Sequence, residues 1–96
     1  MRPVTQIDLA LAACALACAG VDRQAELARA LISKADLADR FRLETGRLHP
    51  EWGDGTLAHV ARLHPRVAEP FLDDPEYRRC VRLVLDALDR VSLRRN

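Results

Sequence analysis

Apolar residues recur along this chain at helical spacing and predict four helices. The first is predicted over residues 6–19, where the middle is apolar on all sides, and the second over residues 23–45, where apolar residues return every three or four positions. A short third helix is predicted over residues 56–63 and a fourth over residues 75–92. The pattern indicates an all-α fold in one domain over residues 1–96, a small bundle of about four helices with a long second helix.

Residues that favour helix starts support these limits. Thr5 and Asp8 have the spacing of a capping box before the first helix. Asp22 is predicted to cap the second helix and Asp54 the third. Asp74, which is followed by proline and glutamate, gives the clearest start signal and is predicted to cap the fourth helix.

The fourth predicted helix carries an apolar seam with heptad spacing over two heptads. Its residues are Tyr77, Val81, Val84, Leu88 and Val91. We expect this seam to form an oligomer or partner interface, although an inward-facing helix of a monomer has the same pattern. The second helix, about 35 Å long at ~1.5 Å per residue, is also expected to project from the body or to form an interface.

Charge limits the functions that the chain can have. The net charge is +1, and 14 of the 15 basic residues are arginines. The C-terminal part is the most basic, and its candidates for contact with nucleic acid or an acidic partner are Arg78, Arg79, Arg82, Arg94 and Arg95. A solvated helix face has the same composition. The near-zero net charge predicts weak, sequence-independent DNA binding at most.

The residues show no pattern typical of an active site. Cys14 and Cys18 lie one turn apart in an apolar run and are interpreted as buried residues of a reducing compartment. His59 and His64 are too far apart around a helix to share a face. We therefore expect no catalytic residues, no cofactor and no metal. The apolar run at residues 9–19 is too short for a bilayer, so we expect a cytoplasmic protein without a membrane partner.

A loop is predicted over residues 47–55, with Trp52 beside a Gly-Asp-Gly turn. The turn could present backbone N–H groups to an anion, but its spacing favours a plain tight turn. Trp52 either anchors the loop on the core or is an exposed partner contact, and the sequence leaves both possibilities open.

Three segments carry a resemblance to a known family. The opening MRPVT at residues 1–5, the stretch TGRLHPEWGDGTL at 45–57 and DDPEY at 73–77 resemble a family of short rhodobacterial proteins, and the resemblance covers the whole chain. This family is associated with the first gene of the phage-like gene transfer agent cluster, so the chain is similar to a gene transfer agent small terminase. The resemblance implies a non-enzymatic helical ring subunit, a homo-oligomer that hands DNA to the large terminase. It carries no functional residues to this chain.

Phage small terminases have an N-terminal helix-turn-helix domain, and none is evident in this sequence. This departure puts specific DNA recognition in doubt. From the resemblance we expect a DNA-packaging adaptor that recruits or regulates the large terminase without recognising a specific DNA sequence. Two alternatives remain, a small helical regulatory or scaffolding protein that binds another protein and a compact DNA-binding regulator.

Overall fold

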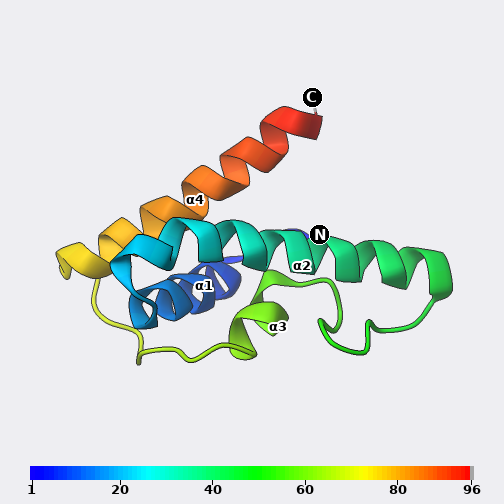
Figure 1. Ribbon diagram of the computed structural model, residues 1–96, viewed down its shortest axis with the longest axis horizontal. Helices are drawn as coiled ribbons and strands as arrows, with labels where there is room; N and C mark the ends of the chain where they lie inside the picture. Colours follow the sequence, from blue (N-terminus) through cyan, green and yellow to red (C-terminus); the bar gives the residue numbers. More distant parts are fainter. Residues whose placement is uncertain (96) are drawn as a thin grey trace.

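Four α-helices enclose a common core in the computed structural model, which describes residues 1–95 and the side chains up to Val91 (Figure 1). The helices of this part of the chain are α1 (Gln6–Cys18), α2 (Gln24–Thr45), α3 (Leu57–Arg62) and α4 (Pro75–Arg95), and the 3-10 turn η1 (Val21–Arg23) precedes α2. No β-strand occurs within residues 1–95. The predicted all-α fold is confirmed, and every predicted helix limit lies within three residues of the observed one.

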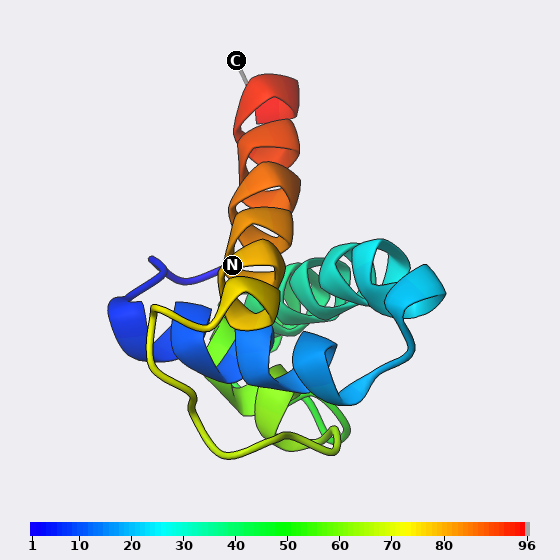
Figure 2. The same ribbon diagram turned by 90° about the vertical axis from the view of Figure 1, so that its left-hand side faces the viewer.

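Helix α1 lies at the centre of the packing. It contacts α4, α3 and α2, and Figure 2 shows it between α4 on one side and α3 on the other. Residues 12–16, more than one full turn, are buried without interruption. A helix surrounded in this way needs apolar residues on every side, which explains the continuous apolar run in its sequence.

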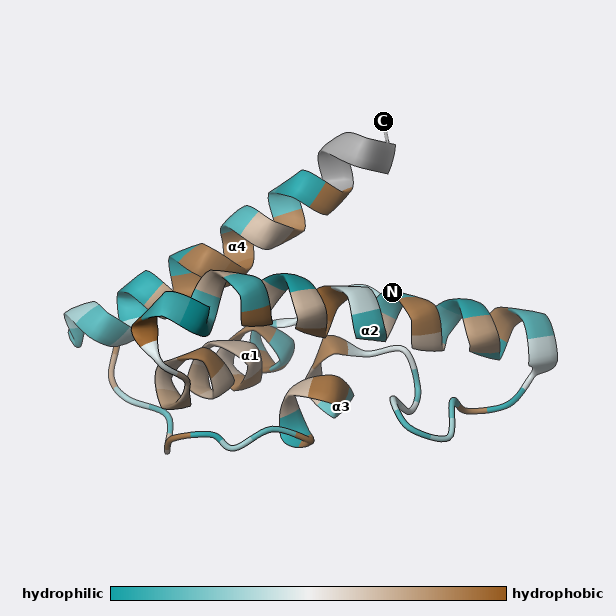
Figure 3. Ribbon diagram, in the orientation of Figure 1, coloured by the Kyte–Doolittle hydropathy of each residue, from teal (hydrophilic) through white to brown (hydrophobic). Residues whose placement is uncertain are grey.

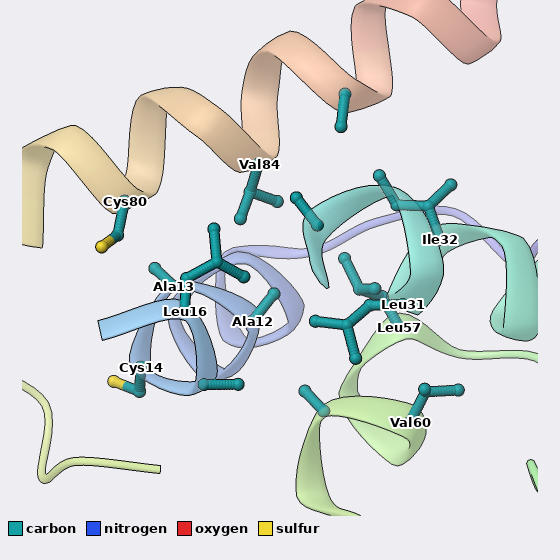
Figure 4. Close-up of a cluster of buried hydrophobic side chains, with 14 of the residues drawn as sticks. Ala12, Ala13, Cys14, Leu16, Leu31, Ile32, Leu57, Val60, Cys80 and Val84 are labelled. Carbon is teal, nitrogen blue, oxygen red and sulfur yellow. The ribbon is translucent and has the colours of Figure 1, made fainter. Parts of the chain in front are cut away.

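Small side chains let the helices approach closely in the core. Figure 4 shows Ala12 and Ala13 of α1 facing the other helices, with Val84 of α4 above them, Leu57 of α3 beside them and Val60 of α3 farther below. All five side chains are fully buried or nearly so. Alanines leave room for larger neighbours to interdigitate, so the core is compact although the chain is short.

The structure confirms two of the predicted helix caps. Thr5 and Asp8 form the capping box of α1, in which the Asp8 carboxylate accepts hydrogen bonds from the Thr5 backbone N–H and hydroxyl, both at 2.8 Å. Asp74 caps α4, because its Oδ1 accepts from the N–H of Glu76 at 2.9 Å and from that of Tyr77 at 3.2 Å. Both caps satisfy N–H groups that have no partner inside the helix.

Two predicted caps are wrong. Asp22 lies inside η1, and the residue that precedes α2 is Arg23, whose side chain makes no capping hydrogen bond. The α3 cap is Thr56, whose hydroxyl accepts from His59 N–H at 3.1 Å. Asp54 instead accepts from the hydroxyl and the N–H of Thr56, at 2.6 and 3.0 Å. It therefore holds the capping residue in place and does not cap the helix itself.

Helices α2 and α4 both extend beyond the common core. The last turns of α2 reach past the other helices, as the sequence predicted, and Leu43 is 69% exposed there (Figure 1). The C-terminal half of α4 leaves the body and diverges from α2 (Figure 1). Polar and apolar residues mix along both extended parts, on α4 as far as Val91 (Figure 3). None of the described helices combines the length and apolar composition that crossing a membrane requires.

Candidate functional site

A groove opens where α4 diverges from α2. Its volume is about 410 Å³. The floor is apolar and the rim is basic: Ile32, Ala87 and Val91 form the floor, and the exposed Arg29, Arg40 and Arg90 form the rim. Such a surface can take an apolar side chain at its centre and acidic groups at its edge.

The acidic residue of the groove is already neutralised. Asp36 lines the groove, and its carboxylate accepts a hydrogen bond from the α-ammonium group of Met1 at 2.6 Å and pairs with Arg40 at 2.7 Å. The ammonium hydrogen bond, helped by Arg40, lowers the pKa of Asp36 to about 2. Asp36 is therefore a carboxylate at neutral pH, and its charge is matched by the two cations beside it.

The same ammonium group reaches a second carboxylate. It lies 3.3 Å from Asp39, which also pairs with Arg42 at 2.7 Å, and these contacts lower the pKa of Asp39, with the Arg42 hydrogen bond as the main cause. Within the described side chains, Arg29 and Arg90 make no ion pair or hydrogen bond. Two guanidinium groups at the rim are thus available to an acidic partner.

The connection between α3 and α4 is the second unusual surface. Phe71 and Leu72 lie on it and are strongly exposed, although both side chains are large and apolar. The connection is tied to α1 where Val67 N–H donates to the carbonyl of Cys14 at 3.3 Å. This surface was not predicted from the sequence. The available signal was a Phe-Leu pair between a proline and two aspartates, a context without helical periodicity and with flanking charge.

Trp52 forms intramolecular contacts in its loop. Its ring stacks on His49 with centroids 4.7 Å apart, and His49 also meets Phe41 edge-on at 5.1 Å. His49 Nδ1 accepts from the backbone N–H groups of Glu51 and Trp52, both at 3.1 Å. Trp52 is half-buried and packs against the core, so it anchors the loop, which is one of the two roles that the sequence left open. Its predicted contact with a partner stays a prediction.

The apolar seam of α4 faces the protein's own core. Tyr77 and Val84 are 4% and 1% exposed, so they cannot also form the predicted contact between folded subunits. For these two residues the interface assignment is wrong, because α1 and α2 already cover them. Val81, Leu88 and Val91 pack against the same core but remain partly exposed. For them a subunit contact stays a prediction.

The predicted basic surface is divided by the fold. Arg79 is half-buried, and its guanidinium donates to Gln24 Oε1 and Glu76 Oε1, both at 2.6 Å, so intramolecular contacts already engage it. Arg78 and Arg82 are exposed one turn apart on α4. The predicted contacts of Arg94 and Arg95 lie outside the described side chains. Arg78 and Arg82 are therefore the described residues for which the predicted contact with nucleic acid or an acidic partner stays a prediction.

The titratable residues of the core offer little chemistry. Burial raises the pKa values of Cys14 and Cys80, which keeps both thiols protonated at neutral pH. Cys18 is exposed, so its predicted burial is wrong: it lies in the last turn of α1, beyond the part that the other helices surround. Cys18 and His64 share a shallow pocket, and no hydrogen bond joins them among the described residues. No cluster of metal-ligating side chains occurs in the part of the chain that was described.

Comparison with known proteins places the chain in a family. No curated protein matches it, and no solved structure matches it. A family model described as a domain of unknown function, DUF7742, matches residues 2–88, which is most of the sequence, and the chain therefore belongs to the DUF7742 family.

Proposed function

We propose that this protein is a non-enzymatic, self-associating adaptor that recruits or regulates a large terminase during DNA packaging by a phage-like gene transfer agent. The observation that carries the adaptor part is the groove between α2 and α4. Its floor is apolar, and its rim arginines Arg29 and Arg90 make no ion pair with any described side chain. Surfaces of this composition bind proteins, since an apolar centre within a polar rim is typical of protein interfaces. The packaging part rests on the resemblance of residues 1–5, 45–57 and 73–77 to small terminases.

The charge distribution supports a protein partner over DNA as the main ligand. The chain has a net charge of +1, and Arg79, Arg40 and Arg42 are engaged in intramolecular ion pairs. A duplex binder of high affinity needs several free cations on one face, because each neutralised phosphate contributes to binding. A helical adaptor that meets DNA weakly and the large terminase strongly fits this distribution better.

Two measurements test the proposal. Light scattering coupled to gel filtration gives the absolute mass of the purified protein over a range of micromolar concentrations, and a multi-subunit assembly is expected. The purified protein is then mixed with the large terminase of a gene transfer agent cluster, and a stable complex on the same column is expected. A protein that stays monomeric and does not bind the terminase would contradict both parts of the proposal.

The same experiments distinguish the alternatives. A scaffolding or regulatory protein would be monomeric or dimeric and would leave the large terminase unbound. A compact DNA-binding regulator would discriminate strongly between duplex sequences at physiological salt, which fluorescence anisotropy with two unrelated duplexes measures. The adaptor is expected to bind both duplexes equally weakly.

A further inference from the structure

The connection between α3 and α4 presents two large apolar side chains that the chain itself leaves uncovered. Phe71 is 86% exposed and Leu72 is 68% exposed. Glu69 and Asp73 flank them, and both acids are exposed without an ion pair in the described part of the chain. Adjacent exposed apolar residues with a polar surround mark a contact surface for another protein. Its chemistry is an apolar centre with negative charge beside it.

The groove between α2 and α4 has the complementary chemistry. Its floor contains Ile32 and Val91, and its rim contains Arg29 and Arg90, which make no ion pair within the described side chains. With a volume of about 410 Å³ it lies in the range of pockets that hold bulky apolar groups. The two surfaces therefore match: both have an apolar centre, and the two arginines of one and the two carboxylates of the other make no ion pair among the described side chains.

We propose that Phe71 and Leu72 of one copy dock into the α2–α4 groove of a second copy, with Glu69 and Asp73 facing Arg29 and Arg90. The proposal deepens the self-association in the proposed function, on which it rests. Charge complementarity selects a second copy as the occupant, because both halves of the contact occur on this chain.

The contact joins different surfaces of the two copies. Within one chain, Pro75 at the start of α4 and Ala87 in the groove are separated by about 18 Å of helix. Figure 1 shows the connection joining α4 at the end opposite its C-terminus, whereas the groove is lined by the C-terminal half of α4. The connection therefore cannot fill its own groove. Each copy donates one connection and accepts one, so the contact closes a two-fold dimer if two copies exchange connections, and otherwise it leads to a ring or a filament.

Two double variants separate the halves of the contact. Phe71→Ala with Leu72→Ala removes the docking side chains and keeps the groove, while Arg29→Glu with Arg90→Glu reverses the rim and keeps the connection. Each variant alone is expected to weaken self-association by at least ~tenfold. All four positions are exposed, so the helical circular dichroism and the melting temperature should stay close to those of the unmodified protein.

Mixing the two variants gives the decisive result. The connection of the arginine variant can enter the groove of the Phe-Leu variant, but the reverse contact is missing. An equimolar mixture should therefore form a heterodimer and nothing larger, as measured by native mass spectrometry. The mass of the unmodified assembly separates the two geometries, because a two-fold exchange stops at a dimer and a head-to-tail contact forms a ring or a filament.

Matched variants control for charge and hydrophobicity. Arg78→Glu with Arg82→Glu changes the net charge equally on the part of α4 outside the groove, and Leu43→Ala with Leu48→Ala removes two exposed leucines elsewhere. Both controls should assemble normally. Assembly that persists in both test variants would overturn the proposed contact and leave the adaptor proposal standing. Unmodified protein that is monomeric at every concentration would overturn both.

Discussion

Asp8 of α1 accepts a hydrogen bond from the backbone N–H of Ala58, in the first turn of α3, at 2.7 Å. Its other carboxylate oxygen accepts from the N–H and the hydroxyl of Thr5, so one buried side chain caps two helices that are 50 residues apart in sequence. This bond fixes the start of α3 against the start of α1. It also explains why a charged residue is tolerated at 5% exposure, since three donors surround it.

Replacing Asp8 by Ala should therefore destabilise the protein by about 2–4 kcal/mol, because it removes a cap and leaves buried N–H groups without acceptors. Urea unfolding followed by circular dichroism measures the loss. Asp74→Ala is the matched control, since Asp74 also caps a first turn but is exposed. It should cost about 1 kcal/mol. Equal losses in the two variants would show that the bond to Ala58 contributes nothing.

Gly55 and Gly46 both have a left-handed backbone, but only at Gly55 would an added side chain collide with neighbouring atoms. Both have positive φ, +88° and +72°. A Cβ at Gly55 would lie 2.7 Å from Asp39 Cβ and 2.8 Å from Asp39 Cα, whereas a Cβ at Gly46 meets nothing within 4 Å. Gly46→Ala should cost about 1–2 kcal/mol from the left-handed conformation alone. Gly55→Ala should cost about 2–5 kcal/mol, because overpacking adds to this strain. Thermal unfolding of both variants provides the measurement, and a cost at Gly55 no larger than at Gly46 would contradict the close packing of this loop on α2.

The sequence was informative about local structure and uninformative about contacts between helices. Local signals such as the Thr5–Asp8 spacing and the Asp74 start predicted helices correctly, because capping depends on residues a few positions apart. The bond from Asp8 to Ala58 and the contact of Met1 with Asp36 join residues that no periodicity connects. Such contacts arise only when the helices pack, so no local pattern predicts them.

The candidate site was less predictable than the fold for a related reason. The heptad spacing on α4 correctly indicated an apolar face, but the pattern is the same whether a neighbouring helix or a neighbouring subunit covers it. The structure resolves Tyr77 and Val84 as core residues. The groove depends on how α4 crosses α2, and both helices also pack on α1, so its shape follows from tertiary packing that no local pattern encodes. Exposure of Phe71 likewise depends on what the fold leaves uncovered.

The Asp36 contact predicts a specific loss of stability in acid. The pKa of Asp36 in the folded protein is about 2, below the usual 3.8. Folding therefore favours the ionised form of this carboxylate, and the ionised carboxylate in turn stabilises the folded state. The resulting stabilisation, up to about 2 kcal/mol, is complete above about pH 4 and is lost as the pH falls toward 2. The free energy of unfolding, measured with urea between neutral pH and pH 2, should show this decrease below about pH 4.

Asp36→Asn removes the titrating group and should flatten that part of the pH profile, while lowering stability at neutral pH. Asp86→Asn on α4 controls for the loss of one negative charge, because Asp86 is exposed and makes no ion pair among the described residues. A pH profile of Asp36→Asn that runs parallel to the original would mean that the ammonium contact does not contribute to stability in solution.

DNA binding should be weak, independent of sequence and steeply reduced by salt. Arg78 and Arg82 are the exposed basic pair on the described part of α4. Replacing both by Ala should reduce the slope of log affinity against log salt by about 1–2, as expected when two phosphate contacts are lost. Fluorescence anisotropy with a labelled duplex measures the slope, and Arg47→Ala with Arg62→Ala, two exposed arginines elsewhere, serves as the control. An unchanged slope would exclude this face from DNA contact.

Substitutions in the apolar seam of α4 should affect folding before they affect assembly. Val84 is 1% exposed between α1 and α2, so Val84→Ala should cost about 1–3 kcal/mol through lost burial and a residual cavity, with the mass of the assembly unchanged. Leu88 is partly buried against the same core, and Leu88→Glu would place a charge beside apolar residues without a partner. We therefore expect Leu88→Glu to lower both the melting temperature and the helical circular dichroism. A Leu88→Glu variant that lost assembly but kept its full helical signal would show that the C-terminal end of the seam joins subunits and does not stabilise the core.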